Sequence, residues 1–329
     1  MYHGGDPAAA AALYGILRDD WLDLSTGINP HAWPWRQRVE FDDVALERLP
    51  SRGDLESLTT AARAAYRVPD ETEILPVAGI EPVIRQLPSL VRKAVLLDTS
   101  YASYRTAFDD EIPVLRGPSE IPARSSVILV NPNNPDGRIL SPETILSLAE
   151  SRQDADLVVV DEAYEDALSE RASVVPLMSR MQNLVVLRSF GKFYGLPGLR
   201  LGFIIAHPPT IAPLRERLGD WPVSQLAITI GRHALADREW QEKTRLRLDT
   251  QAHELRALLA AHALQFESQS PLLALIRDDR AAEMHRGLAA HGIWTRIFTD
   301  RPGSLRLGLP GDESEFRRLE VALKEILPS

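Results

Sequence analysis

Short apolar runs recur between residues 54 and 210 of this 329-residue chain, with helix-forming segments between several of them. A strand with one face in water alternates apolar and polar residues, whereas a strand covered on both faces is apolar throughout. The runs therefore predict a parallel or mixed sheet in an α/β fold, with helices on both faces. The expected strands are Glu73–Val77, Ala94–Leu97, Val127–Val130, Leu157–Val160, Leu184–Leu187 and Leu201–Ile205.

Helix start signals lie around and between these runs. Asp6 and Ser141 each precede a proline, which is the pattern of an N-cap followed by the first helical turn. We expect Asp54 to cap a further helix that extends to Tyr66, and Glu81–Val91 has helical spacing of its apolar residues. These signals predict helices that connect the strands.

The pattern changes after about residue 210. Residues 223–263 are compatible with long helices, which suits a connector between domains. The remainder predicts strands at Leu272–Ile276, Ile293–Ile297 and Leu305–Leu309, with helices at 280–290 and 313–326. We therefore expect three parts: an arm over residues 1–30, a large domain over 31–215 and a smaller α+β domain over 216–329.

Composition restricts the classes of function. The formal net charge of −9 argues against a nucleic-acid or anionic-membrane partner. The chain has no cysteine, which excludes disulfides, thiolate metal sites and cysteine nucleophiles, and we expect no metal site. The first 21 residues lack a basic segment followed by an unbroken apolar run, so they predict neither a signal peptide nor a membrane span. The expected location is the cytoplasm.

Three of the predicted strands end in polar sequences. Val127–Val130 runs into Asn-Pro-Asn-Asn-Pro-Asp-Gly, Leu157–Val160 into Asp-Glu-Ala-Tyr, and Leu184–Leu187 into Arg-Ser-Phe-Gly-Lys. Each alone has an ordinary explanation as a turn, a helix cap or a surface lysine. However, the carboxyl ends of parallel strands are where such sheets place their functional residues. Together the three ends therefore favour a single site.

One cofactor would use all of the polar groups at these strand ends. They are an amide, an acid with a tyrosine three residues later, and a lysine with an arginine eight residues later. Pyridoxal phosphate needs a lysine for a Schiff base, an acid at its ring nitrogen, and donors for its phenolate oxygen and phosphate. An apolar segment that contains another cation also favours the neutral amine, which is the nucleophilic form. The sequence therefore predicts a pyridoxal-phosphate site.

The motifs that carry this chemistry resemble those of a known family. Ser189-x-x-Lys192-(x7)-Arg200 resembles the lysine motif of the fold-type I pyridoxal-phosphate enzymes, in the class I/II aminotransferase superfamily. Asn-Asn-Pro-Asp-Gly resembles its N-P-x-G turn, and Asp161-Glu-Ala-Tyr164 its D-x-x-Y motif. The resemblance implies a fold-type I transferase with a mostly parallel, seven-stranded type of sheet, a smaller α+β C-terminal domain and a homodimer.

The resemblance also implies roles for these residues. Lys192 would form the Schiff base and move protons, and Asp161 would pair with the ring nitrogen. Tyr164 and Asn134 would donate hydrogen bonds to the phenolate oxygen. Tyr101 matches the position of the aromatic residue that stacks on the pyridine ring.

The cofactor phosphate would be bound by Ser189, Arg200 and backbone amides near Gly79 and Ile80. The last two lie between a predicted strand and the next helix, where N–H groups point toward an anion. One departure concerns Leu49, which stands where many relatives have a tyrosine that reaches the partner subunit's cofactor phosphate. This departure leaves the cross-subunit contact in doubt.

The reaction depends on residues at the substrate's far ends, because orientation decides which bond at Cα breaks. His3-Gly-Gly followed by Leu-Asp-x-Ser-x-x-Ile-Asn-Pro is similar to the threonine-phosphate decarboxylases of cobalamin synthesis. That similarity implies decarboxylation of O-phospho-L-threonine to (R)-1-amino-2-propanol phosphate. Arg306 would then bind the carboxylate, together with Asn134. The candidates for the substrate phosphate are His3, Gly27, Ile28 and Arg296.

Alternatives remain at this stage. An aminotransferase of the histidinol-phosphate type would use the same lysine as a proton shuttle between Cα and the cofactor. Related enzymes have an asparagine where Gly27 stands, so that contact would fall to the backbone here. A cofactor-binding regulator or an inactive paralogue is a third hypothesis, against which the intact lysine, aspartate and arginine argue.

Overall fold

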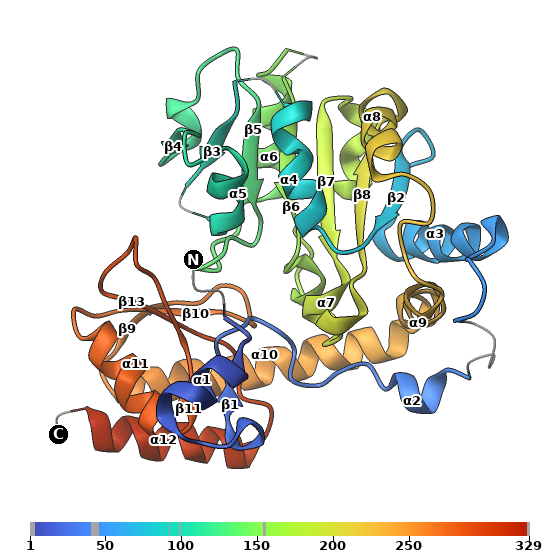
Figure 1. Cartoon of the computed structure of the whole chain (residues 1–329). Helices are drawn as coiled ribbons and strands as arrows, with labels where there is room; N and C mark the ends of the chain where they lie inside the picture. The colour runs from blue at the N-terminus through green and yellow to red at the C-terminus, as the bar shows by residue number, and fades with distance from the viewer. Residues whose placement is uncertain (1–3, 41–45, 92, 99, 154–155, 328–329) are drawn as a thin grey trace. The chain divides into compact units, whose positions relative to one another are not determined.

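The computed structural model describes residues 4–40, 46–91, 93–98, 100–153 and 156–327 (Figure 1). The chain divides into two compact units. Unit 1 comprises Met1–His31, Pro135–Arg138 and Lys243–Ser329. Unit 2 comprises Ala32–Asn134 and Ile139–Glu242. The division differs from the expected boundary near residue 215 and groups the N-terminal arm with the C-terminal region.

Unit 2 contains the predicted sheet, with seven strands in the order β2-β8-β7-β6-β5-β3-β4. Only β8 runs antiparallel to its neighbours β2 and β7, so the mostly parallel sheet is confirmed. The strands are β2 (Glu73–Val77), β3 (Val95–Leu97), β4 (Val114–Leu115), β5 (Val127–Val130), β6 (Val158–Asp161), β7 (Leu184–Ser189) and β8 (Gly202–Ala206).

The apolar runs located six of these strands because their side chains are buried on both faces. Every residue of β5 and β6 is buried, as are all residues of β7 except Ser189. Val114–Leu115 was not predicted: this edge strand has two residues, one exposed and one half-buried. Such a short strand carries no recognisable periodicity.

The helices of unit 2 connect the strands and cover the sheet, with α4 in front of it in Figure 1. They are α2 (Trp35–Arg38), α3 (Arg52–Tyr66), α4 (Glu81–Leu90), α5 (Ala102–Ala107), α6 (Pro142–Glu150), α7 (Phe190–Phe193), α8 (Pro208–Leu218) and α9 (Gln225–Ala236). The 3₁₀ helices of this unit are η2 (Pro118–Glu120), η3 (Glu165–Ala167), η4 (Val175–Arg180) and η5 (Pro197–Leu199).

The start of α3 differs from the prediction. Ser51 is the N-cap, and its side chain accepts a hydrogen bond from the Asp54 N–H. The Asp54 carboxylate accepts in return from the Ser51 N–H at 2.9 Å, which completes a capping box. Asp54 is thus the third residue of the helix and not its cap.

The position of the unit boundary follows from how α8 and α9 pack. Helix α8 contacts β2 and β8, and α9 contacts α3, all within unit 2. In α9, Gly231 permits this approach, because an added Cβ would lie 2.9 Å from Leu58 of α3. The chain therefore changes units inside the next helix, α10 (Arg238–Ala261), at residue 243.

Unit 1 combines the arm with the C-terminal region. Strand β1 (Leu22–Asp23) pairs in parallel with β11 (Ile293–Trp294), and four antiparallel strands form a sheet in the order β12-β13-β10-β9. Its other elements are α1 (Pro7–Tyr14), η1 (Arg18–Asp20), β9 (Gln265–Glu267), β10 (Ala274–Arg277), α11 (Ala281–Ala290), β12 (Arg296–Ile297), β13 (Ser304–Leu307) and α12 (Glu313–Ile326).

The arm is fixed by an aromatic cluster within unit 1. Trp21 packs edge-on against Trp294 with a centroid distance of 5.6 Å, and Tyr14 packs against both rings. Asp6 caps α1, as predicted. In the described ranges, no helix combines the length and apolar character that a membrane crossing requires.

Candidate active site

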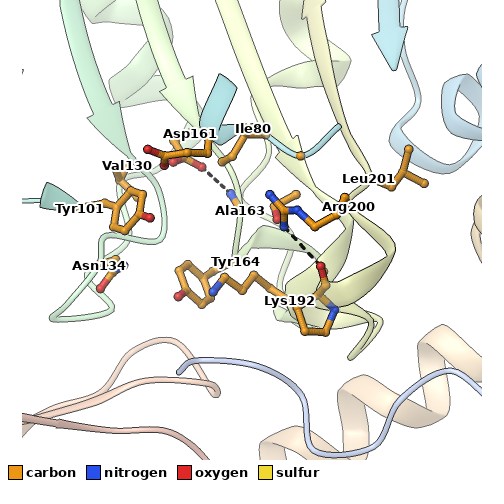
Figure 2. Close-up of a pocket in the computed structure, with 15 residues that line it drawn as sticks. Ile80, Tyr101, Val130, Asn134, Asp161, Ala163, Tyr164, Lys192, Arg200 and Leu201 are labelled. Carbon is orange, nitrogen blue, oxygen red and sulfur yellow. Dashed lines mark hydrogen bonds between the residues drawn. The ribbon is translucent and has the colours of Figure 1, made fainter. Parts of the chain in front are cut away.

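A pocket of about 170 Å³ lies in unit 2, at the carboxyl ends of β5, β6 and β7 and the start of α4 (Figure 2). It includes every residue that the sequence assigned to the cofactor. Those residues are Gly79, Ile80, Tyr101, Asn134, Asp161, Tyr164, Ser189, Lys192 and Arg200. The polar strand ends therefore meet at one place, as the parallel sheet requires.

Asp161 is the last residue of β6, and its carboxylate is buried. One oxygen, Oδ1, accepts the N–H of Ala163 at 2.9 Å, and the other, Oδ2, accepts the hydroxyl of Tyr104 at 2.8 Å. Burial raises the pKa of Asp161 to about 6, although both hydrogen bonds and the charge of Lys192 oppose the rise. Asp161 can therefore present a carboxylate to the pocket at neutral pH.

Lys192 lies on α7, a single turn that follows β7 directly. Phe190 and Phe193 of this turn are buried, and Phe190 stacks on Tyr194 with centroids 4.2 Å apart. These contacts hold the turn in place while the half-buried lysine extends along the pocket. Its Nζ lies 5.5 Å from the centroid of the Tyr164 ring (Figure 2).

The other end of the pocket is suited to an anion. Gly79 has φ 77°, and a Cβ built on it would lie 2.6 Å from Nη2 of Arg200. Glycine at this position therefore allows the guanidinium to approach the backbone at the start of α4. Ser189, at the end of β7, adds a hydroxyl to the same pocket. Helix N–H groups, a guanidinium and a hydroxyl are donors that bind phosphate.

A buried ionic cluster lies beside this pocket. Arg188, fully buried, donates from Nη1 to Glu162 at 2.6 Å and to Glu165 at 2.7 Å, and from Nη2 to Asp166. Arg171 donates to Glu165 from two nitrogens, at 2.7 and 2.6 Å. We call these five residues the Arg188 cluster. The sequence placed Arg188 in a polar strand end but gave no sign of its partners.

Asn134, a candidate for the substrate carboxylate, lines the pocket in unit 2, whereas the other candidate substrate residues that the structure describes lie in unit 1. Arg306 of β13 is buried and donates from Nη2 to the carbonyl of Ser25 at 2.5 Å. Arg296 of β12 is its cross-strand neighbour and is half-buried. Close to Ser25 in sequence, the N–H of Ile28 donates to the carbonyl of Thr26 at 3.0 Å. Arg306 and the segment around residue 25 are thus joined.

Of three other expected features, the structure describes Gly27 and Leu49. Gly27 precedes Ile28 in the same turn of unit 1. His3 lies outside the described residues. Leu49, where the resemblance implied a tyrosine, is 66% exposed.

Comparison with known proteins places the chain in a family. The model of the family described as aminotransferase class I and II matches residues 102–323. The chain belongs to this family. The match includes the segments after β5, β6 and β7 and also β13 of unit 1, which carries Arg306.

Individual relatives within the family are similar over almost the whole chain. A threonine-phosphate decarboxylase from Pseudomonas aeruginosa is 38% identical over 98% of this chain and 97% of its own length. One from Sinorhizobium sp. is also 38% identical, with the same coverage. Histidinol-phosphate aminotransferase from Sinorhizobium meliloti, solved in complex with pyridoxal-5'-phosphate, has a TM-score of 0.81 at 19% identity, covering 99% of this chain and 95% of that chain.

The polar groups in the pocket fit the cofactor named for that complex. A primary amine, a buried carboxylate, two phenols, an amide, and a guanidinium beside a helix start match each polar part of pyridoxal phosphate. Within the described ranges, no group of three or more histidine, aspartate or glutamate side chains is arranged to hold a metal ion. The pocket therefore brings together residues of the three motifs from which we predicted a pyridoxal-phosphate site.

Sequence reasoning missed Tyr104 and Glu81. Tyr104 of α5 follows Tyr101, the N-cap residue of that helix, by three positions, and this spacing was a signal for a shared face. It gave no reason to expect contact with Asp161, which lies 57 residues away. Glu81 was assigned only to a helix, whereas it lines the pocket at the first turn of α4.

Proposed function

We propose that this chain binds pyridoxal phosphate and decarboxylates O-phospho-L-threonine to (R)-1-amino-2-propanol phosphate, as a cytoplasmic homodimer in cobalamin biosynthesis. The observation that carries the proposal is the 38% identity to the threonine-phosphate decarboxylase from Pseudomonas aeruginosa over 98% of the chain. The match covers 98% of the chain, so it extends over segments of both compact units. The pocket supports the proposal through its chemistry.

The cofactor would be held at five points. Lys192 would bind it covalently, Asp161 would accept a hydrogen bond from the protonated ring nitrogen, and Tyr101 would cover the ring face. Tyr164 and Asn134 would donate to its phenolate oxygen. The phosphate would be bound by Ser189, Arg200 and the backbone at Gly79 and Ile80. When bound, pyridoxal phosphate supplies an electron sink for the bond that breaks at Cα.

The chain's own residues would then orient the substrate and move protons. Arg306 would bind the carboxylate, with Asn134, so that the bond from Cα to the carboxyl carbon is held in the reactive orientation. The substrate phosphate would be bound by His3, the backbone of Gly27 and Ile28, and Arg296. As this bond breaks, the carboxyl group leaves as carbon dioxide, and Lys192 Nζ or a water delivers one proton to Cα.

The second candidate is transamination of histidinol phosphate. It is favoured by 31% identity to the histidinol-phosphate aminotransferase from Chromohalobacter salexigens, over 94% of this chain and 87% of its own length. Both reactions need the same lysine, aspartate and arginines. They differ in which bond at Cα breaks, which is set by substrate orientation.

The test uses carboxyl-labelled O-phospho-L-threonine and the purified protein loaded with pyridoxal phosphate. We expect labelled carbon dioxide and 1-amino-2-propanol phosphate, and we expect Lys192→Ala to release neither. In parallel, histidinol phosphate with 2-oxoglutarate should give no glutamate. Glutamate formation without carbon dioxide release would replace the proposed function with the aminotransferase.

A further inference from the structure

Tyr104 is a buried polar group that the proposed mechanism does not use. It lies on α5, its ring packs in the main core of unit 2, and it is edge-on to Tyr101 at 6.5 Å. A buried tyrosine hydroxyl needs a hydrogen-bond partner. That partner is Oδ2 of Asp161, at 2.8 Å.

The direction of this hydrogen bond follows from the two groups. Burial raises the pKa of Tyr104 well above its ordinary value, and the neighbouring Asp161 raises it further. The phenol therefore stays protonated at neutral pH and donates to the carboxylate. With the Ala163 N–H on Oδ1, each carboxylate oxygen receives one donor, which fixes the plane of the group. Each oxygen also keeps a second lone pair, so the carboxylate can still accept a donor from the pocket it lines.

The charge on Asp161 is finely balanced. Burial raises its pKa to about 6, whereas Tyr104, the Ala163 N–H and the Lys192 charge lower it, and Glu81 raises it. The charged and titratable groups that face it are thus Tyr104 from α5, Lys192 from α7 and Glu81 from α4. Removal of the hydroxyl from Tyr104 would raise the pKa of Asp161 and so increase the fraction of neutral acid at pH 7.

We propose that Tyr104 is a positioning residue that keeps Asp161 ionised and oriented toward the pocket. The use made of that charge, pairing with the ring nitrogen of pyridoxal phosphate, rests on the proposed function. The charge itself does not, because the hydrogen bond lies within the chain. The two can therefore be tested separately.

The decisive experiment titrates Asp161 in the full-length protein without cofactor, by carboxyl ¹³C NMR, with Asp161→Asn to assign the resonance. Tyr104→Phe keeps the ring and removes the hydroxyl. We expect the Asp161 pKa to rise by about one to two units, a ten- to hundredfold increase in proton affinity. Tyr66→Phe is the matched control, because it removes another fully buried hydroxyl of unit 2 that does not contact Asp161.

A second readout is the affinity for pyridoxal phosphate as a function of pH. Tyr104→Phe should weaken binding about two- to tenfold at pH 7, and binding should recover at higher pH, where Asp161 is again ionised. Asp161→Asn should bind weakly without such recovery. An unchanged Asp161 titration in Tyr104→Phe, or a shift of equal size in Tyr66→Phe, overturns the proposal.

If Tyr104→Phe does not fold, 3-fluorotyrosine at position 104 provides the test in the opposite direction. The fluorine makes the phenol a stronger donor, so the Asp161 pKa should fall, and a rise or no change would contradict the positioning role. Failure of the proposed function is a distinct result. It would appear as an absence of carbon dioxide release in the unaltered protein while the titration shift persists.

Discussion

Two neighbouring regions at the ends of β6 and β7 differ in whether their cations are paired with acidic side chains. In the Arg188 cluster, a fully buried arginine is surrounded by Glu162, Glu165 and Asp166. In the pocket, Arg200 is exposed, and in the described part of the chain neither it nor Lys192 forms a salt bridge. Adjacent residues belong to different regions, because Asp161 lines the pocket while Glu162 contacts Arg188.

The difference indicates which cations serve the fold and which serve a ligand. A buried cation that is paired within the chain needs no external anion, and its loss leaves carboxylates uncompensated. A cation that lines a pocket without an acidic partner remains available to a bound anion. Arg188 and Arg200 are the same residue type and are only twelve positions apart. The sequence alone therefore does not show which of them is paired within the fold and which is available to a ligand.

The largest expected effect is on stability, from Arg188→Met. The substitution leaves three buried carboxylates without their central cation, so we expect the free energy of unfolding to fall by about 3–5 kcal/mol. Urea unfolding of the cofactor-free protein measures this. Arg171→Met is the control, because Arg171 is partly exposed and its loss should cost about 1 kcal/mol. A loss of only about 1 kcal/mol in Arg188→Met would contradict the assignment of Arg188 to the stability of the fold.

The next effect is on cofactor affinity, from Arg200→Gln. We expect binding of pyridoxal phosphate to weaken about ten- to hundredfold, because a charge-assisted contact to the phosphate is lost. The unfolding free energy of the cofactor-free protein should change by no more than about 0.5 kcal/mol. Equilibrium dialysis and urea unfolding measure the two quantities. The exposed Arg217 of α8, changed to glutamine, should alter neither. A large loss of stability with unchanged affinity would assign Arg200 to the fold.

The smallest effect concerns pH and Glu162. Burial raises the pKa of Glu162 to about 7 from an ordinary value of 4.5, although Arg188 opposes the rise and Glu165 adds to it. Because the folded state binds this proton more tightly, the stabilising contribution is complete below about pH 4.5 and is lost as the pH rises through 7.

We therefore expect the wild-type unfolding free energy to exceed that of Glu162→Gln by an amount that decreases between pH 5 and pH 8. The slope is at most about 1.4 kcal/mol per pH unit for one proton. Urea unfolding of both proteins at several pH values measures it. A difference that stays constant, or grows with rising pH, would show that Glu162 is ionised throughout.

The sequence predicted those features that depend on chain-local patterns. Buried strands have continuous apolar runs, so β2 and β5 were predicted to the residue. Motif residues at strand ends met in one pocket because parallel strands end at the same edge. Contacts between distant segments were not predictable from one sequence. The hydrogen bond from Tyr104 to Asp161, and the three acids around Arg188, depend on how helices and turns pack after the sheet has formed.

The unit boundary shows the same limit. The change of pattern near residue 210 reflects the end of the last strand of the sheet, not the end of the packed unit. Helix α9, at the start of the connector expected over residues 223–263, buries Ile228 within unit 2, and α8 before it buries Ile211 and Leu214 there. Which surface a helix covers is a tertiary property, which its own residues do not specify.

The pairing of β1 with β11 has a consequence for biosynthesis. Leu22 is matched with Ile293, so nearly the whole length of the chain separates the two partners of this ladder. During translation the arm, with Trp21 and Leu24, leaves the ribosome long before its binding surface exists, whereas all residues of unit 2 precede residue 243. The nascent chain therefore exposes an apolar segment until the C-terminal region has been synthesised. During this interval we expect chaperones to bind the segment.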